Sequence, residues 1–329
     1  MVKNTATVIL AAGKSTRMNS SFSKVLHKIY GKTMLEYITD SIRAIGINKI
    51  CIVTNRNNDL SKAVDKTGGI DLVFQDKLMG TGHALRQTSK VFENFNGDLL
   101  VLYGDTPLLK SDVLKNLVEK HKSSKAACTL LTTSVSDPKG YGRIIRDKKN
   151  DVVDIVEENV ASVREKMIKE INVGVYCFNA KEVFKVLQGL KAKGSKSEYY
   201  LTDAVGMLAR EKHAIESLHI EDIDQTLGVN TRLHLARAQA IVKERILTQH
   251  MMEGVGIIDP ETTHIYHDVT IGQDTIIYPF TVIERDVVIG KRCRIGPFAR
   301  IRPGCVLKDE VEIGNYVEMV RTKVGSGSA

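Results

Sequence analysis

The sequence predicts an α/β domain with a mostly parallel sheet, followed by one long helix and a short parallel β-helix. Over residues 1–230, apolar runs of strand type alternate with amphipathic segments of helical type. Residues 231–253 then show helical periodicity with no internal glycine or proline, and from residue 265 an aliphatic side chain recurs every six positions. We therefore divide the 329 residues into a sheet domain at 1–230, a linker helix at 231–254 and a β-helix at 255–329.

The first part of the chain supplies strands and helices in alternation. A buried strand at residues 8–10 precedes an amphipathic helix at 35–45. The elements expected next are a strand at 50–54, a helix around 59–66, strands at 71–74 and 99–103, a hairpin-rich region at 140–176 and a helix beginning near 203. Ligands of open sheets bind beyond the carboxyl ends of the strands, so functional residues are expected directly after each apolar run.

The last segment is organised by a six-residue period. The aliphatic positions are Ile265, Ile271, Ile277, Ile283, Ile289, Ile295, Ile301, Leu307, Ile313 and Met319, and a compact side chain stands four positions after each of the first nine. Such strict periodicity predicts coils that stack and bury the aliphatic column. It resembles the left-handed hexapeptide β-helix, which has three hexads per coil. Cys293 and Cys305 fall on the compact inward position, so we interpret them as packing residues rather than ligands or nucleophiles.

The loop after the first strand is a candidate anion site. Ala11, Ala12 and Gly13 have little or no side chain, so a ligand can approach the backbone closely, and Gly13 can take a positive φ. Backbone N–H groups in such a turn form a concave anion site, and Arg17 and Lys24 supply positive charge. The implied ligand is a nucleoside triphosphate lying across the carboxyl end of the strand. An ordinary strand-to-helix turn with surface lysines is the alternative.

Two common phosphate-binding motifs are excluded at this loop. Residues 13–16 are similar to the end of a Walker A loop, but Val8 stands where that motif requires a glycine. The dinucleotide-binding pattern G-x-G-x-x-G is also absent here. The loop therefore belongs to neither class.

A polar segment after the strand at 71–74 is a candidate base-binding site. The Gln75 carboxamide offers a donor and an acceptor, which suits the edge of a pyrimidine base. Gly80 and Gly82, on either side of Thr81, would let the backbone pass close to that base. A plain loop explains the same residues without a ligand.

A candidate metal site follows the apolar run at 99–103. Asp105 ends this buried strand with no adjacent basic residue, which suits Mg²⁺, a hard ion that prefers oxygen ligands. Asn230 offers a neutral oxygen that could complete the metal shell. An aspartate that caps the following turn is the alternative.

These motifs resemble those of the sugar-1-phosphate nucleotidyltransferases. Residues 10–13, 16–18 and 23–24 are similar to the family's opening motif, L-A-A-G-x-x-T-R-M followed by P-K. Ser15 stands where glycine is commonest, and Ser23 replaces the usual proline. Neither departure removes a charge, so the resemblance implies a Rossmann-like nucleotide-binding domain.

The resemblance also implies roles for later residues. The family's Q-x(4)-G-T-G-H-A motif, matched from Gln75, contacts uracil and ribose, and its Y-G-R-I, V-E-x and E-I-N-x-G motifs wrap the sugar. Gly142, Glu157 and Asn172 would therefore contact the hexose hydroxyls or the N-acetyl group, and Thr202 could reach a sugar or phosphate oxygen. The motifs around Thr202 and Asn230 point to uridylyltransferases that make UDP-N-acetylglucosamine.

The expected reaction is transfer of UMP from UTP to N-acetylglucosamine-1-phosphate, with release of pyrophosphate and Mg²⁺ as cofactor. The expected catalytic residues are Arg17 on the β/γ-phosphates, Lys24 at the α-phosphate and Asp105, with Asp105 and Asn230 as metal ligands. The expected substrate contacts are Leu10, Ala11, Ala12, Gly13, Lys24, Gln75, Gly80, Thr81, Tyr103, Gly104, Asp105, Gly142, Glu157, Asn172, Thr202 and Asn230. The alternatives are another UTP- or dTTP-dependent hexose-1-phosphate nucleotidyltransferase and a non-catalytic sugar-nucleotide-binding regulatory protein.

The order of motifs resembles that of the bacterial enzymes that combine this uridylyltransferase with a glucosamine-1-phosphate acetyltransferase. In those enzymes the acetyl-transfer histidine and the acetyl-CoA loops lie beyond the point where this sequence stops, and Val320 stands where a basic residue usually helps to hold the amino-sugar phosphate. Acetyltransferase activity is therefore expected to be absent in this chain. The resemblance also implies a homotrimer formed through the β-helix.

Composition indicates which binding partners and which cellular compartment to expect. The net charge is +8, with 47 Lys and Arg against 39 Asp and Glu, but the lysines are spread along the chain, which favours a lysine-rich surface over a nucleic-acid-binding face. Five scattered cysteines without a C-x-x-C pair indicate reduced thiols and a cytoplasmic location. No signal-peptide pattern and no run of eighteen apolar residues is present, so we expect no membrane association.

Overall fold

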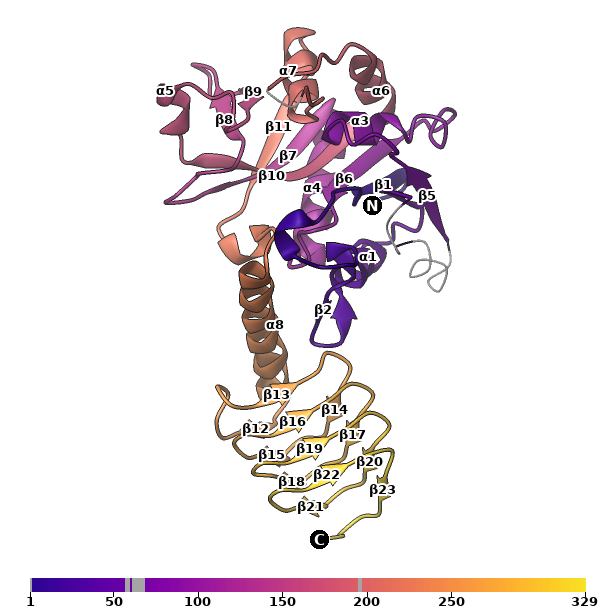
Figure 1. Ribbon diagram of the computed structural model, residues 1–329, viewed down its shortest axis with the longest axis vertical. Helices are drawn as coiled ribbons and strands as arrows, with labels where there is room; N and C mark the ends of the chain where they lie inside the picture. The colour runs from indigo at the N-terminus through magenta and orange to yellow at the C-terminus, as the bar shows by residue number, and fades with distance from the viewer. Residues whose placement is uncertain (1, 57–59, 61–68, 195–196) are drawn as a thin grey trace. The chain divides into compact units, whose positions relative to one another are not determined.

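The computed structural model describes residues 2–56, 60, 69–194 and 197–329. The chain divides into two compact units (Figure 1), one made of Met1–His27 with Met34–Thr231 and the other of Lys28–Thr33 with Arg232–Ala329. This division groups the long helix with the β-helix and adds to them a short segment from the first part of the sequence. The helix expected around residues 59–66 lies outside the described residues.

The first unit is built on a nine-stranded sheet with the strand order β11-β7-β10-β6-β1-β4-β5; in addition, β8 pairs with β10, and β9 pairs with β8. The strands are β1 (Thr5–Leu10), β4 (Ile50–Thr54), β5 (Ile70–Phe74), β6 (Asp98–Tyr103), β7 (Cys128–Ser134), β8 (Arg143–Arg146), β9 (Val152–Val156), β10 (Glu170–Asn179) and β11 (Ile215–His219). Strands β6, β1, β4 and β5 are parallel, as are β7 and β11, whereas β10 runs antiparallel to both β6 and β7. The mostly parallel sheet predicted from the sequence is confirmed.

Both faces of this sheet are covered because its central strands are apolar on both sides. Along β1, Val8 packs into one hydrophobic cluster and Ile9 into the other, and Leu99 and Leu100 of β6 alternate in the same way. Helices α1 (Met34–Ala44) and α4 (Ser111–Ser124) cover the Ile9 side, while α3 (Thr81–Arg86), α6 (Ala180–Gln188) and α7 (Thr202–Arg210) cover the Val8 side. The short α5 (Val163–Lys166) begins with a capping box at Ser162.

The carboxyl ends of β1, β4 and β6 meet at one edge of the sheet, and backbone hydrogen bonds join the loops that leave them. Gly104 N–H donates to Leu10 O at 2.9 Å, and Val229 N–H donates to Asp105 O at 2.7 Å. Short 3-10 turns at Thr16–Met18, Lys24–Leu26 and Ile223–Thr226 complete this part of the unit. The edge therefore gathers backbone from three distant parts of the sequence, where the sequence pattern placed the ligand.

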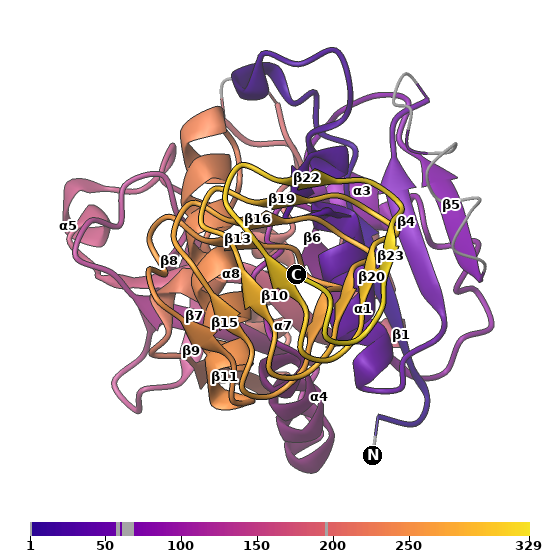
Figure 2. The ribbon, with the colours of Figure 1, turned by 90° about the horizontal axis from the view of Figure 1, so that it is seen from below.

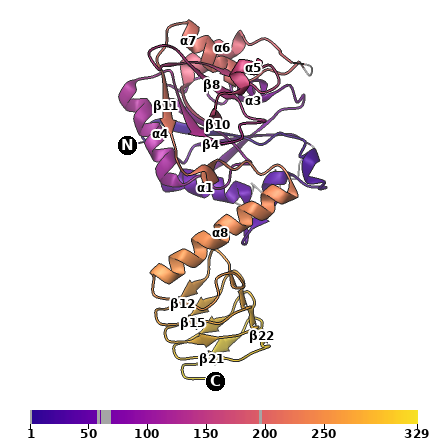
Figure 3. The same ribbon diagram turned by 90° about the vertical axis from the view of Figure 1, so that its left-hand side faces the viewer.

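The second unit contains the hairpin β2 (Lys28–Ile29) and β3 (Lys32–Thr33), helix α8 (Arg232–Met252) and a parallel β-helix. The coil strands are β12 (Gly256–Ile257), β13 (His264–Ile265), β14 (Thr270–Ile271), β15 (Ile276–Ile277), β16 (Val282–Ile283), β17 (Val288–Ile289), β18 (Arg294–Ile295), β19 (Arg300–Ile301), β20 (Val306–Leu307), β21 (Glu312–Ile313), β22 (Glu318–Met319) and β23 (Lys323–Val324). They form three four-stranded sheets (Figure 2) that enclose a common interior. Figure 3 shows the coils stacked, with β12, β15 and β21 along one side.

The register of these coils confirms three hexads per turn. Ile265 pairs with Ile283, which pairs with Ile301, which pairs with Met319, so each partner is one coil further along the chain. The compact positions point inward as predicted: Cys293 and Cys305 are fully buried in the apolar core of the coils. The left-handed sense of the coil stays a prediction.

Candidate active site

The loop after β1 has a different backbone from the one expected. Gly13, which as a glycine can take a positive φ, is not in the left-handed region, whereas Ser15 is, with φ 56° and ψ 22°. A Cβ added at Gly13 would meet no atom within 4 Å, so this glycine leaves open space at the loop surface instead of turning the chain. The left-handed residue is thus the one that departs from the family motif, where glycine would adopt this conformation without strain.

Ser15 also ties the loop to the turn that carries Lys24. Its hydroxyl accepts the Lys24 backbone N–H at 3.1 Å and lies 3.4 Å from Gly13 O. The left-handed backbone at Ser15 and this hydrogen bond together fix where the Lys24–Leu26 turn begins. The sequence alone identified Ser15 only as a departure from the motif, although its place at a position that favours glycine was a usable signal of an unusual backbone angle.

Lys24 lies at the centre of a charged cluster. Its ammonium donates to an Asp105 carboxylate oxygen at 2.5 Å and to Asn230 Oδ1 at 2.8 Å. The Arg17 guanidinium donates to the same Asn230 oxygen at 3.1 Å. The structure thus brings together all four residues to which the sequence assigned charge or metal chemistry. No basic residue is adjacent to Asp105 in the sequence, but Lys24, which is distant along the chain, contacts it in space.

The oxygens of Asp105 and Asn230 fit a hard divalent cation. A carboxylate and a neutral amide oxygen converge here on one positive charge, the Lys24 ammonium, which shows that the two groups can serve a common cation. Within residues 2–56, 60, 69–194 and 197–329, no group of three or more His, Cys, Asp or Glu side chains is arranged to hold a metal. A cation at Asp105 and Asn230 would therefore take its remaining ligands from substrate phosphates and water.

The Gln75 side chain is buried and hydrogen-bonded within the protein. Its side chain is only 3% exposed, and its amide nitrogen lies 3.0 Å from Gly80 O and 2.9 Å from His83 Nδ1. Burial, together with the Arg86 charge, lowers the pKa of His83, so the ring is neutral at pH 7 and Nδ1 can accept this hydrogen bond. The amide nitrogen that was expected to donate to a base is thus engaged inside the protein.

Gly80 and Gly82, on either side of Thr81, leave room for residues 199–201 to pack against this turn. Gly80 has φ +100°, and a Cβ there would lie 2.5 Å from Tyr199 O, while a Cβ at Gly82 would lie 2.6 Å from a Leu190 methyl group and 3.1 Å from Tyr199 O. Gly82 N–H donates to Tyr199 O at 2.8 Å, and Leu201 N–H donates to the Thr81 hydroxyl at 3.0 Å. Residues 199–201 therefore pack closely across the turn, and the approach of a base to these glycines stays a prediction.

The residues predicted to contact the sugar also lie together. Asn172 N–H donates to Gly142 O at 2.9 Å, and a Cβ at Gly142 would be 3.6 Å from both Asn172 Cβ and a Glu157 oxygen. The Thr202 hydroxyl donates to Glu157 Oε1 at 2.8 Å. Burial raises the pKa of Glu157, opposed by the Thr202 hydrogen bond. Asn172 lies on β10, a central strand of the sheet, where a buried polar side chain needs a function or a partner.

The remaining predicted contacts support the loops. Leu10, Ala11 and Ala12 are almost fully buried, and a Cβ at Gly104 would lie 3.0 Å from Val25 and 3.2 Å from Ala11. Ala11, Ala12 and Gly104 are small because the strand ends pack closely, so their backbone atoms are the parts that a ligand can reach. The roles of all these residues toward substrate stay predictions.

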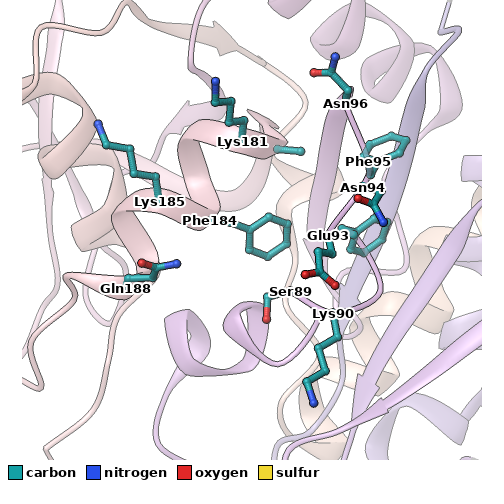
Figure 4. Close-up of a pocket in the computed structure, with 12 residues that line it drawn as sticks. Ser89, Lys90, Glu93, Asn94, Phe95, Asn96, Lys181, Phe184, Lys185 and Gln188 are labelled. Atoms are coloured by element: carbon teal, nitrogen blue, oxygen red, sulfur yellow. The ribbon is translucent and has the colours of Figure 1, made fainter.

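A separate groove of about 800 Å³ lies between residues 89–96 and α6 (Figure 4). Lys90, Lys181 and Lys185 line it, and the Phe184 ring faces into it. The groove adjoins the start of β6 and the end of β10, which pair antiparallel, so the length of β6 separates it from Asp105. No predicted site residue lines it.

Two protein-family models match this chain. A family model described as the MobA-like NTP transferase domain matches residues 7–197, more than half of the chain. The chain belongs to this family. A second model, the six-repeat bacterial transferase hexapeptide, matches residues 286–320. Both matches agree with the two units of the fold.

Curated relatives are similar to most of this chain. The chain is 42% identical over 276 residues to the bifunctional protein GlmU of Pelotomaculum thermopropionicum, covering 84% of this chain and 60% of the relative. It is 42% identical over 281 residues to the bifunctional protein GlmU of Clostridioides difficile, covering 85% and 61%. The chain thus spans about 60% of the length of the curated relatives it matches.

A solved structure shows the same fold. A putative glucose-1-phosphate thymidylyltransferase from Bacillus anthracis matches with a TM-score of 0.59 at 21% identity, over 72% of this chain and 94% of that one. In the described part of the chain, no helix has the length and apolar character needed to cross a membrane.

Proposed function

We propose that this chain transfers UMP from UTP to N-acetylglucosamine-1-phosphate, giving UDP-N-acetylglucosamine and pyrophosphate. The observation that carries the proposal is the cluster of Lys24, Asp105 and Asn230 at the carboxyl edge of the sheet, beside the open backbone of Gly13. Membership of the NTP transferase family and the similarity to proteins named GlmU support the nucleotide as donor.

The chain's own residues would act by position and charge. Two anions must be brought together, so Arg17 would hold the β/γ-phosphates and Lys24 would neutralise charge at the α-phosphate. Both side chains already converge on Asn230, which brings two positive charges together. A sugar phosphate is ionised at neutral pH, so the reaction needs no nucleophile from the protein.

Mg²⁺ is the cofactor that fits this site. Asp105 and Asn230 would hold it, and when bound it would supply further neutralisation of phosphate charge. Lys24 would then exchange its carboxylate partner for a substrate phosphate oxygen, which keeps every charge in the cluster paired.

The sugar would lie against Gly142, Glu157, Asn172 and Thr202. An amide, a carboxylate and a hydroxyl offer donors and acceptors that suit sugar hydroxyls and an N-acetyl group. The three side chains converge from β10, the end of β9 and the start of α7, so a single ligand could contact all of them.

The β-helix supports a homotrimer as the proposed assembly. Beyond the match to hexapeptide repeats, the β-helix exposes a column of stacked aromatic rings. The ring centroids of Phe280 and Phe298 are 4.9 Å apart, and those of Phe298 and Tyr316 are 5.1 Å apart. Phe280 is 52% exposed, Phe298 44% and Tyr316 77%. Contiguous exposed apolar groups favour a protein contact. Light scattering tests this, and a monomer at micromolar concentration would contradict it. All five cysteines are free and buried, which supports the proposed cytoplasmic location.

A pyrophosphate-release assay tests the reaction. The protein is supplied with UTP and Mg²⁺ and, in parallel, with N-acetylglucosamine-1-phosphate, glucosamine-1-phosphate or glucose-1-phosphate; dTTP replaces UTP in a second series. The proposal expects the highest kcat/KM with UTP and N-acetylglucosamine-1-phosphate. A preference for glucose-1-phosphate would favour the alternative hexose-1-phosphate nucleotidyltransferase, and no release with any pair would contradict enzymatic function.

A further inference from the structure

Tyr176 is a buried phenol that the predicted site does not include. It lies on β10, is 0% exposed and belongs to the apolar cluster on the Val8 side of the sheet. A buried tyrosine hydroxyl needs a hydrogen-bond partner, and the identity of that partner shows what the hydroxyl does. Here the partners are two residues predicted to bind substrate.

The first partner is Asn172, whose amide orientation the hydroxyl fixes. The Asn172 amide nitrogen donates to the Tyr176 hydroxyl at 2.6 Å, and the Gly174 backbone N–H donates to Asn172 Oδ1 at 3.1 Å. A backbone N–H can only donate, so Oδ1 must face Gly174 and the NH₂ group must face Tyr176. Both ends of the amide are therefore assigned by the protein before any ligand binds.

An irregularity in β10 makes this contact possible. In a regular strand, residues four apart are separated by roughly 13 Å along the strand, too far for these side-chain groups to meet easily. The pairing of β10 with β7 shifts register between Asn172 and Tyr176, and Gly174 between them has φ +83°. The irregularity brings Asn172 and Tyr176 together on the same side.

The second partner is Tyr103. Its ring fills the space where a Cβ of Gly174 would be, with the nearest ring atom 2.3 Å from that position. The Tyr176 and Tyr103 hydroxyls are hydrogen-bonded to each other, and the Tyr103 hydroxyl is also hydrogen-bonded to the Thr81 side chain. A continuous chain of side-chain hydrogen bonds thus runs from Asn172 through Tyr176 and Tyr103 to the turn at Thr81.

We propose that Tyr176 is a positioning residue for the sugar-phosphate pocket, which holds the Asn172 amide in its binding orientation through the hydrogen bond between Asn172 and Tyr176. This inference rests on the proposed function. Tyr176 has no exposed surface and cannot itself touch a ligand. Loss of its hydroxyl would leave the Asn172 amide held only at Oδ1, by the Gly174 N–H, which weakens sugar binding without altering the triphosphate site at Lys24.

The test is Tyr176→Phe, which removes one hydroxyl and keeps the ring in the core. Pyrophosphate release is measured with whichever sugar 1-phosphate the wild-type protein turns over best. The expected result is a KM for the sugar phosphate raised about fivefold, the effect of one lost hydrogen bond, with the KM for UTP changed less than twofold. Thr88→Val is the matched control, because Thr88 is also fully buried and its hydroxyl donates to Leu85 O at 2.7 Å away from the site.

A double-mutant cycle separates positioning from general stability. In an Asn172→Ala background, Tyr176→Phe is expected to change the KM for the sugar phosphate less than twofold further, because the residue through which it acts is gone. Full additivity of the two effects, or equal changes in the KM values for sugar phosphate and UTP, would overturn the inference. Absence of turnover in the wild-type protein would contradict the proposed function, whereas normal turnover with an unchanged Tyr176→Phe variant would contradict only this inference.

Discussion

Gly80 and Gly13 of the candidate site are required for different reasons, one for folding and one for ligand binding. Substituting each by alanine should distinguish these two roles. Gly80 has φ +100° and ψ 175°, a region that only glycine populates readily, and its missing Cβ leaves room for the Tyr199 backbone. Gly13 has an ordinary φ and open space where a Cβ would stand. Gly80→Ala is therefore expected to damage the fold, and Gly13→Ala to damage only ligand binding.

The magnitude for Gly80→Ala follows from its contacts. The unfavourable backbone angle costs about 1–3 kcal/mol. A Cβ 2.5 Å from Tyr199 O and 2.8 Å from Tyr199 N must also push this segment away. That movement weakens the hydrogen bonds Tyr199 N–H to Met79 O, Gly82 N–H to Tyr199 O and Leu201 N–H to Thr81, each contributing about 1 kcal/mol. A total loss of about 4 kcal/mol in the free energy of unfolding lowers Tm by roughly 10 °C in a unit of this size.

Gly13→Ala should leave Tm within about 2 °C of wild type, since the added methyl group meets no protein atom. The same methyl group would stand where the triphosphate is proposed to lie, so the KM for UTP should rise at least about tenfold. Thermal unfolding followed by circular dichroism and pyrophosphate release give the two readouts. A wild-type KM for UTP in Gly13→Ala would show that the triphosphate does not lie against this loop, and a wild-type Tm in Gly80→Ala would refute the close approach of Tyr199.

Substitutions at three other residues follow from the same geometry. Ser15→Ala keeps the left-handed backbone angle but loses the hydrogen bond to the Lys24 N–H, so calorimetry should show Tm lowered by about 3–5 °C. Ser15→Gly loses the same hydrogen bond but relieves the backbone strain, so it should melt within about 2 °C of wild type. Equal Tm values for the two variants would contradict this account. Burial raises the folded-state pKa of Glu157, so its stabilising contribution is present below the unfolded-state pKa near 4.5 and is lost as pH rises through the folded-state pKa. Glu157→Gln should therefore melt above wild type at pH 7 and close to it at pH 4, with a raised KM for the sugar phosphate; a lower Tm at pH 7 would contradict the sign. Lys24→Met should lower kcat about 10³-fold with a near-native circular dichroism spectrum, and a loss under tenfold would remove Lys24 from catalysis.

Periodic features of the fold were accessible from the sequence. The six-residue recurrence from Ile265 to Met319 predicted stacked coils, and the resemblance to the hexapeptide β-helix implied three hexads per coil. In the structure each aliphatic residue pairs with the one eighteen positions later. The buried strands β4 and β6 were placed within one residue for a similar reason, since continuous apolar runs have few other stable locations. The antiparallel direction of β10 was not predicted, because direction depends on how the chain returns and not on the local pattern.

The parts of the site that escaped prediction depend on contacts between distant residues. Lys24 and Asp105 are 81 positions apart, and no local pattern shows that their side chains meet. Tyr176 has the sequence context of a core residue, and only the irregularity at Gly174 brings its hydroxyl to Asn172. The backbone angle at Ser15 was missed because glycine at position 13 seemed the natural place for a left-handed turn, whereas the loop turns two residues later.

The charged cluster at the sheet edge is tested most directly by Asp105→Ala. The rate of pyrophosphate release from UTP and N-acetylglucosamine-1-phosphate is measured as a function of Mg²⁺ concentration for the wild type and the variant, with Tm as the check on folding. We expect kcat of the variant to fall at least about 10³-fold with loss of the Mg²⁺ dependence, while Lys24 keeps its contact with Asn230 and the fold persists. A folded Asp105→Ala protein with near-normal, Mg²⁺-dependent release would contradict the assignment of this cluster as the active site.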